Sequence, residues 1–165
     1  MPKVSAGLLM IDPEGRFLLA HPGGPYFTRR DLGVWSIPKG LVEPGEELLS
    51  AAKREFAEEI GFSPEPTELF ALGSVRQSGG KVVHAWAFRG VWDPKQLRSN
   101  LMEIEWPPRS GKMASFPEVD QARFFDLEEA EEKIVAAQTP LLRRAASWFG
   151  KLPPHRDRDE GPGSR

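Results

Sequence analysis

Short runs of hydrophobic residues separated by turn sequences predict that the beginning of the chain is mostly strand. Residues 4–10 and 17–20 form two such runs around the turn sequence Asp12-Pro13-Glu14-Gly15. Residues 34–37 form a third run that leads into Pro38-Lys39-Gly40. The intervening residues 21–30 are rich in glycine and proline, which predicts a loop between the second and third strands.

The middle of the chain predicts a hairpin. Residues 69–77 and 81–88 flank Ser78-Gly79-Gly80, a sequence suited to a tight connection between antiparallel strands. Both faces of the 81–88 run are largely apolar, so we expect this strand in the interior of the sheet.

The last third predicts strands followed by helices. Residues 104–106 are expected as a short strand before a polar loop at 107–115. Residues 121–125 are expected as a strand that enters a helix at 127–137, and Pro140 suits the first turn of a last helix ending near Gly150. Proline, glycine, arginine and aspartate prevail from Lys151 onward. We therefore expect one domain at 1–150 and a disordered tail at 151–165.

Residues 40–62 combine a glycine-containing loop with a strongly acidic helix. The apolar positions of this helix share one face, which we expect to be buried: Leu49, Ala52, Phe56 and Ile60. Glu59, Glu55 and Glu58 follow in that order on one flank, so Glu59 is expected nearest the core. Arg54 lies one turn from Glu58 and can hold it in place.

The ends of this helix carry recognisable signals. Pro44-Gly45 forms a turn, Glu46 and Glu47 complement the positive end of the helix dipole, and Gly61 suits a left-handed cap. Three crowded carboxylates with only Arg54 to offset them destabilise a purely structural helix. Divalent cations or a phosphate-bound metal would neutralise the cluster. The alternative is the solvated acidic face of an ordinary amphipathic helix.

Composition narrows the possible chemistry. The net charge is -2 and there are no cysteines, which excludes disulfides, thiol catalysis and thiolate metal sites. His21, His84 and His155 are too scattered along the sequence to predict a zinc site. The short N-terminal apolar run contains Asp12 and Pro13, and no segment approaches a transmembrane length. We therefore expect a cytoplasmic protein without a membrane partner or a stable nucleic-acid partner.

The acidic helix and its loop follow a fixed spacing: Gly40, five residues, Glu46, seven residues, Arg54-Glu55-Phe56, one residue, Glu58-Glu59, one residue, Gly61-Phe62. This pattern resembles the Nudix box at each fixed position, although Phe56 stands where the family more often has an aliphatic residue. Runs outside the box, such as SAGLLM, GVWSIPKG and FPEVDQARFFDLEEA, resemble a bacterial subgroup of MutT-like nucleoside triphosphate pyrophosphohydrolases. The resemblance covers essentially residues 1–150 and argues against a purely structural acidic helix.

The resemblance implies a fold and a reaction. The fold is the α/β (α+β) Nudix fold, an α/β/α sandwich with a mixed central sheet and a catalytic loop-helix-loop. The reaction is hydrolysis of a pyrophosphate bond in a nucleoside diphosphate linked to another moiety, by water activated with Mg²⁺ or Mn²⁺. The implied metal ligands are Glu55, Glu58, Glu59 and the backbone carbonyl of Gly40. Arg54 would orient a catalytic carboxylate, Glu46 would support the loop, and Glu55 is one candidate for the general base.

Other residues are candidates for catalysis or substrate binding. Glu118, in the loop before residues 121–125, could supply a further ligand or base, and Glu103 and Glu105 are similar candidates. Each of these acids could equally be a solvated loop carboxylate. Candidate substrate contacts combine cations with rings: Lys39, the loop residues Tyr26, Phe27, Arg29 and Arg30, the pair Arg76-Gln77, and Arg109-Ser110-Gly111-Lys112. A surface lysine and a loop folded onto the core are the alternatives. Trp35, Trp86, Trp106 and His84 are expected to pack in the interior.

Three classes of function are compatible with an acidic helix of this kind. A pyrophosphohydrolase acting on a nucleoside tri- or polyphosphate agrees best with the subgroup resemblance. Dinucleoside polyphosphates of the Ap4A type, diphosphoinositol compounds and nucleotide sugars are alternative substrates. A non-catalytic Nudix sensor commonly lacks box glutamates, whereas this chain keeps them all. An interaction protein built around the helix would not explain the fixed glycines and Arg54. The sequence leaves the oligomeric state open.

Overall fold

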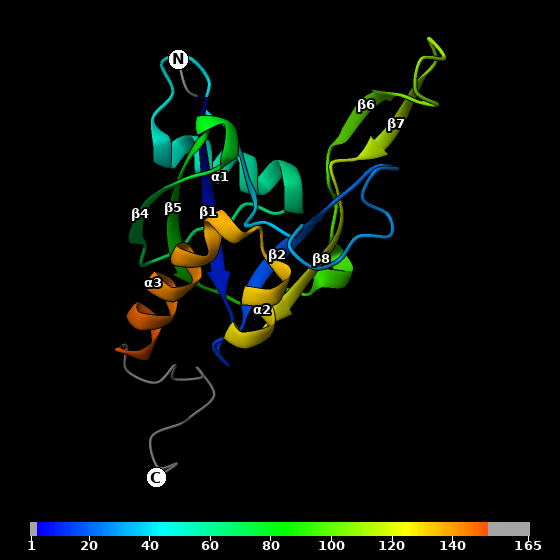
Figure 1. The fold of residues 1–165 in the computed structure, drawn as a ribbon. Coiled ribbons are helices and arrows are strands. Elements are labelled where there is room, and N and C mark those ends of the chain that lie inside the picture. The colour runs from blue at the N-terminus through cyan, green and yellow to red at the C-terminus, as the bar shows by residue number, and fades with distance from the viewer. Residues whose placement is uncertain (1–2, 152–165) are drawn as a thin grey trace.

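Strand β1 (Val4–Ile11) is apolar along most of its length and lies at the centre of a mixed sheet in the computed structural model of this chain (Figure 1). Its neighbour β5 (Val82–Arg89) pairs with it in parallel along its whole length, from Val4–Val82 to Ile11–Arg89. On its other side, β5 pairs antiparallel with β4 (Phe70–Arg76), which confirms the expected hairpin and the interior position of residues 81–88. The structure describes residues 3–151, so the expected tail at 151–165 lies outside it except for Lys151.

The remaining strands complete the sheet around β1. The order is β4-β5-β1-β2-β8, where β2 is Phe17–Pro22 and β8 is Val119–Phe125. The short strand β3 (Lys39–Leu41) pairs with the first half of β1, whereas β2 pairs with its end, at Ile11 and Phe17. This arrangement places the start of the acidic loop directly beside the central strand.

Alternate residues of β1 bury opposite faces of the sheet. Leu8 and Met10 share a hydrophobic cluster with Phe56 of helix α1 (Leu48–Ile60). Leu9 and Ile11 belong to a second cluster with helix α3 (Thr139–Gly150), which lies beside helix α2 (Leu127–Lys133). Figure 1 shows the helices on the two faces of the sheet. The expected three-layer arrangement with a mixed sheet is confirmed, and no helix within residues 3–151 could cross a membrane.

Residues 34–37 do not form the predicted strand. Ser36 and Ala20 exchange backbone hydrogen bonds of 2.8 and 3.0 Å, but this contact is an isolated bridge. The next hydrogen-bonded position of an antiparallel ladder with β2 would be two residues further on, at Pro38, because the Ile37 N–H faces away from β2 and donates to the side chain of Gln138 at 3.0 Å. Pro38 has no N–H to donate. The regular strand therefore begins only at Lys39.

The predicted polar loop at 107–115 is partly strand. β6 (Leu101–Glu105) and β7 (Met113–Pro117) form a separate two-stranded hairpin, which projects from the sheet in Figure 1. One face of β6 is exposed to solvent, so the hairpin lacks the hydrophobic run by which a buried strand is recognised. The helix predicted at 127–137 is also shorter than expected. It ends at Lys133 because Ile134 turns into an extended, buried position beside Trp35.

Candidate functional site

The loop of residues 42–47 joins β3 to α1 and brings the box glycine against the box helix. Gly40 lies so close to Glu55 that an added Cβ would be 2.0 Å from the carboxylate carbon. The backbone of β3 therefore covers this side chain, and Glu55 is only 9% exposed. Glu55 is therefore less exposed to solvent than Glu59, which the helical wheel places nearest the core. The wheel describes the helix alone and does not include the strand that packs on it.

Arg54 connects the acidic groups around the helix. Its Nε and Nη2 donate to the two oxygens of Glu46 at 2.8 and 2.9 Å, and Nη1 donates to Glu55 at 2.8 Å and Glu58 at 3.2 Å. Nη2 also donates to the carbonyl of Leu41 at 3.0 Å. These hydrogen bonds, chiefly the ones to Glu46, raise the pKa of Arg54. The hydrogen bonds from Arg54 in turn lower the pKa of Glu46 to about 2. Glu46 also accepts from the Glu43 N–H at 3.0 Å, so it holds the loop to the helix.

The carboxylates form one electrostatic cluster. Burial raises the pKa of Glu59 to about 8; the charges of Glu55 and Glu118 act in the same direction, and that of Lys39 acts against it. Burial likewise raises the pKa of Glu55, whereas the hydrogen bond and the charge of Arg54 lower it. The pKa of Glu118 is raised by burial and then by the charges of Glu55 and Glu58. Glu118 therefore belongs to the same cluster although it comes from the connection between β7 and β8.

The cluster has the chemistry of a hard-cation site but is not a preformed cage. Within residues 3–151, no three His, Asp or Glu side chains converge closely enough to enclose an ion. Arg54 instead bridges Glu55 and Glu58. The donors available are carboxylate oxygens, the ligand type that Mg²⁺ and Mn²⁺ prefer. Added positive charge would relieve the repulsion among these acids, so the residues present fit such an ion.

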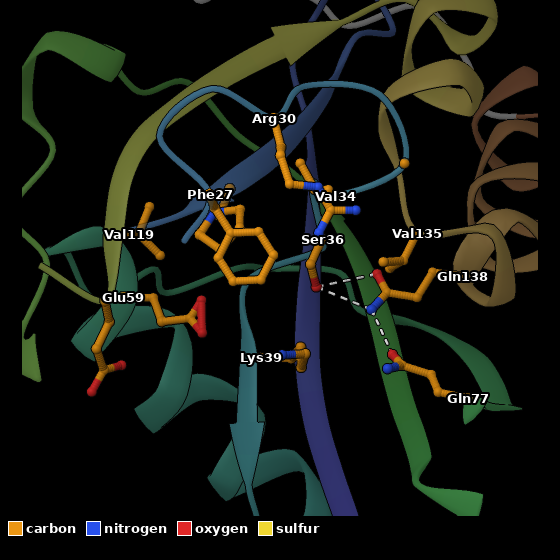
Figure 2. Close-up of a pocket in the computed structure, with 14 residues that line it drawn as sticks. Phe27, Arg30, Val34, Ser36, Lys39, Glu59, Gln77, Val119, Val135 and Gln138 are labelled. Atoms are coloured by element: carbon orange, nitrogen blue, oxygen red, sulfur yellow. Dashed lines mark hydrogen bonds between the residues drawn. The ribbon is translucent and has the colours of Figure 1, made fainter. Parts of the chain in front are cut away.

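A cavity of about 340 Å³ opens beside this cluster (Figure 2). Lys39, Glu59 and Glu118 lie on its charged side. The remainder of the lining is neutral apart from one arginine, and it includes Phe27, Arg30, Val34, Ser36, Gln77, Val135 and Gln138. The cavity is thus acidic where the box helix reaches it and mostly neutral at the other end.

The loop of residues 22–30 is fixed to the rest of the site by His21. This buried side chain lies 2.7 Å from Asp120 through Nδ1 and 2.7 Å from the Arg30 carbonyl through Nε2. Gly23 passes so close to β7 that a Cβ there would lie 1.8 Å from the Pro117 carbonyl oxygen. The Gly23 N–H also donates to the Glu118 carbonyl at 2.9 Å. These contacts hold the loop against the residue that joins the acidic cluster.

The structure brings some of the predicted substrate contacts to the cavity and places others elsewhere. Lys39 and Glu118 line it with Glu59, as do Phe27 and Arg30 from the loop. Tyr26 is 53% exposed and packs edge-on against Trp106, with ring centres 5.5 Å apart. Arg29 lines a different hollow that contains His21 and Asp120.

The remaining candidates lie further from the cavity lining. Arg76 is an exposed residue at the end of β4, next to Gln77, which does line the cavity. Arg109 lies in the connection at the end of the β6–β7 hairpin. Glu103 and Glu105 occupy the exposed face of β6. Trp106 is 37% exposed, so the expectation that it packs in the interior is wrong, whereas Trp35 is 1% exposed, in agreement with that expectation.

Two polar residues of the cavity wall, Ser36 and Gln138, were not predicted from the sequence. Gln138 is fully buried at the start of α3, and its side chain hydrogen-bonds to Ser36, Ile37 and Gln77. A single glutamine between apolar residues and Thr139-Pro140 carries no sequence signal for such a role. Its partners are distant in the chain, so only the fold reveals them.

Comparisons with known proteins agree with this geometry. The family model described as NUDIX domain matches residues 1–145. An RNA pyrophosphohydrolase from Rhodopseudomonas palustris is 37% identical over 161 residues, which cover 91% of this chain and 92% of that protein. Another from Afipia carboxidovorans is 25% identical over 156 residues, which cover 88% of this chain and 90% of that protein.

Two solved structures show the same fold. A C. elegans Ap4A hydrolase in a binary complex has a TM-score of 0.63 at 23% identity, covering 90% of this chain and 99% of that one. The NUDIX domain of Shewanella oneidensis NrtR, complexed with ADP ribose, has a TM-score of 0.59 at 15% identity, and the match covers 90% of this chain and 89% of that one. At these identities the likeness extends to the fold alone.

Proposed function

The chain belongs to the Nudix family and is a pyrophosphohydrolase, and on that premise we propose that it cleaves a pyrophosphate bond in the 5′-polyphosphate of a nucleotide with Mg²⁺ or Mn²⁺. The observation that carries the proposal is the mixed cavity lining, in which the acids Glu59 and Glu118 lie on one side and mostly neutral groups, the Phe27 ring among them, form the rest. The charged side suits a polyphosphate with its cations, and the neutral side suits a nucleoside. A cytoplasmic location is part of the same proposal.

The box residues have distinct roles in this proposal. Glu55, Glu58, Glu59 and the Gly40 carbonyl would hold the divalent ion, which supplies charge neutralisation at the phosphate oxygens and a lowered pKa for the attacking water. Lys39 faces the same side of the cavity and would bind a phosphate oxygen. Glu55 and Glu118 are the candidates to accept the proton of the water. Arg54 keeps Glu55 and Glu58 in place through its two bonds from Nη1.

Replacing Arg54 by lysine should reduce turnover about tenfold, because one ammonium cannot reproduce the fork that binds Glu46 while it also reaches Glu55. The measurement is the kcat of Arg54→Lys. The control is Arg143→Lys, which makes the same change at an exposed arginine paired with Glu131 on α2 and should keep the kcat of the wild type. Equal kcat values for Arg54→Lys and the wild type would contradict the positioning role of Arg54.

The 5′ end of RNA is a second candidate substrate. The relative that is 37% identical over nearly the whole chain is an RNA pyrophosphohydrolase. A triphosphorylated RNA end and a free nucleoside triphosphate present the same polyphosphate to the acidic side of the cavity. They differ only beyond the first nucleoside, where the RNA continues as a chain and the free nucleotide ends.

A substrate panel with product identification tests the proposal. Nucleoside triphosphates, a dinucleoside tetraphosphate, a nucleotide sugar and a 5′-triphosphorylated oligoribonucleotide would be incubated with Mg²⁺, and phosphate and pyrophosphate would be measured separately. We expect turnover of the free triphosphates or of the RNA end, with a nucleoside mono- or diphosphate end as product. Turnover confined to the nucleotide sugar would refute the polyphosphate assignment, and no turnover on any compound would favour the non-catalytic sensor.

A further inference from the structure

Gln138 is a fully buried side chain whose amide hydrogen-bonding capacity is used within the protein. Its Oε1 accepts from the Ile37 N–H at 3.0 Å and lies 3.3 Å from the Ser36 hydroxyl. Its Nε2 donates to Ser36 Oγ at 3.0 Å and to Gln77 Oε1 at 2.8 Å. Gln138 therefore has no remaining donor for a ligand, and its effect on the cavity passes through its partners.

The backbone N–H of Ile37 fixes the orientation of both glutamine amides. A backbone N–H can only donate, so the oxygen of Gln138 must face it and the nitrogen of Gln138 must face away. That nitrogen donates to Gln77, so the oxygen of Gln77 must face Gln138. The NH₂ group of Gln77 is consequently directed away from Gln138 and into the cavity, as Figure 2 shows.

The Gln77 NH₂ group has no acceptor in the part of the chain that the structure describes. Its backbone is nevertheless well fixed, since its N–H donates to Lys81 at 2.7 Å and its carbonyl accepts from Gly80 at 3.1 Å. A held side chain that directs two hydrogens into a cavity is prepared to bind an acceptor on a ligand.

The surroundings of this NH₂ group suit a heterocyclic base. In Figure 2 the Phe27 ring lies between the Glu59 carboxylate and Ser36, and Val34 and Val135 add apolar surface on the side of Gln138. Bases stack readily on aromatic rings, and their edges then lie within reach of hydrogen-bonding side chains. The carboxylates that would attend the polyphosphate lie on the opposite side, with Lys39.

We propose that Gln77 donates a hydrogen bond to a ring carbonyl of the substrate base, so that the enzyme favours keto bases over amino bases. Guanine O6 and uracil O4 are acceptors, whereas adenine and cytosine carry amino groups at the same positions and would place donor against donor. Gln138 is a positioning residue that acts by holding Gln77. The inference rests on the proposed function, because it needs a nucleotide in this cavity.

The experiment compares kcat/KM for GTP with ATP and for UTP with CTP, in the wild type and in Gln77→Leu. We expect the wild type to favour the keto member of each pair about tenfold, and Gln77→Leu to bring both ratios close to one. ITP should behave like GTP, because it keeps O6 and lacks only the 2-amino group. Gln96→Leu, at an exposed glutamine outside the cavity, is the matched control and should keep the wild-type ratios.

Gln138→Glu tests the positioning step without touching the substrate. The introduced carboxylate still accepts from Ile37 but cannot donate to Gln77, whose amide would turn and present its oxygen to the cavity. At pH 8.5 we expect the keto preference to be lost or reversed in this variant. Unchanged ratios in Gln77→Leu, or equal rates for all four bases in the wild type, would overturn the inference.

A binding measurement separates this inference from the proposed function. The affinities of GMP and AMP, measured by calorimetric titration of the wild type and Gln77→Leu, report base recognition without turnover. Tighter binding of GMP that disappears in Gln77→Leu would support the inference even if the hydrolysed bond differs from the one proposed. Equal binding of GMP and AMP by the wild type, together with normal triphosphate hydrolysis, would refute base recognition alone.

Discussion

Glu59→Gln is expected to reduce turnover by at least about two orders of magnitude, the scale of losing one electrostatic or acid–base contribution at an active site. Glu59 is the box acid that lines the cavity, and burial together with the charges of Glu55 and Glu118 raises its pKa. The amide of glutamine has nearly the same shape but cannot bind a divalent cation as a carboxylate does. Glu58→Gln should give a loss of similar size. The measurement is kcat with saturating Mg²⁺.

The folding control for these variants follows from the same electrostatics. Because glutamine cannot ionise within this buried, crowded cluster, the metal-free melting temperature of Glu59→Gln should not fall below that of the wild type. A low kcat together with an unchanged or higher melting temperature would show that the substitution impairs catalysis and not folding. Rates close to wild type in both Glu58→Gln and Glu59→Gln would refute the assignment of the acidic helix as the active site.

Gly40→Ala should reduce kcat about 100-fold, because its Cβ would stand 2.0 Å from the carboxylate carbon of Glu55. The carboxylate must move by an ångström or more, and displacements of that size at a reacting centre cost about this factor. The φ angle of Gly40 is outside the left-handed region, so the cost comes from this contact rather than from backbone strain.

Gly150→Ala is the control for the glycine substitution. A Cβ at Gly150, the last residue of α3, would meet no atom within 4 Å, and its φ is also outside the left-handed region. This variant should keep the activity of the wild type. If Gly40→Ala were as active as Gly150→Ala, Glu55 would not need its position against β3, and its proposed role would be wrong.

The acidic helix was predictable because its information is local. Arg54, Glu55 and Glu58 lie within two turns of one helix, so their contacts follow from helical geometry. The left-handed cap at Gly61, with φ of 96°, likewise follows from its place after the last apolar residue. The burial of Glu55 was not predictable from the helix, because a strand from outside the helix covers it.

The cavity wall was not predictable because its contacts join distant segments. Gln77 and Gln138 are 61 positions apart, and Gln138 and Ile37 are 101 apart. No pattern in the sequence links these residues. The loop of residues 22–30 shows the same limit, since its contact through His21 to Asp120 joins it to a distant strand. Its composition indicated rings and cations, but the fold directs Phe27 to the cavity and Tyr26 to Trp106.

The central claim is that the box carboxylates of this chain act with a divalent cation on a nucleotide polyphosphate. The most direct measurement is the rate of GTP hydrolysis by the wild type during a Mg²⁺ titration that begins in excess EDTA. We predict no turnover in EDTA and a saturable rise in rate as free Mg²⁺ increases. The same rate in EDTA as in saturating Mg²⁺ would contradict this claim.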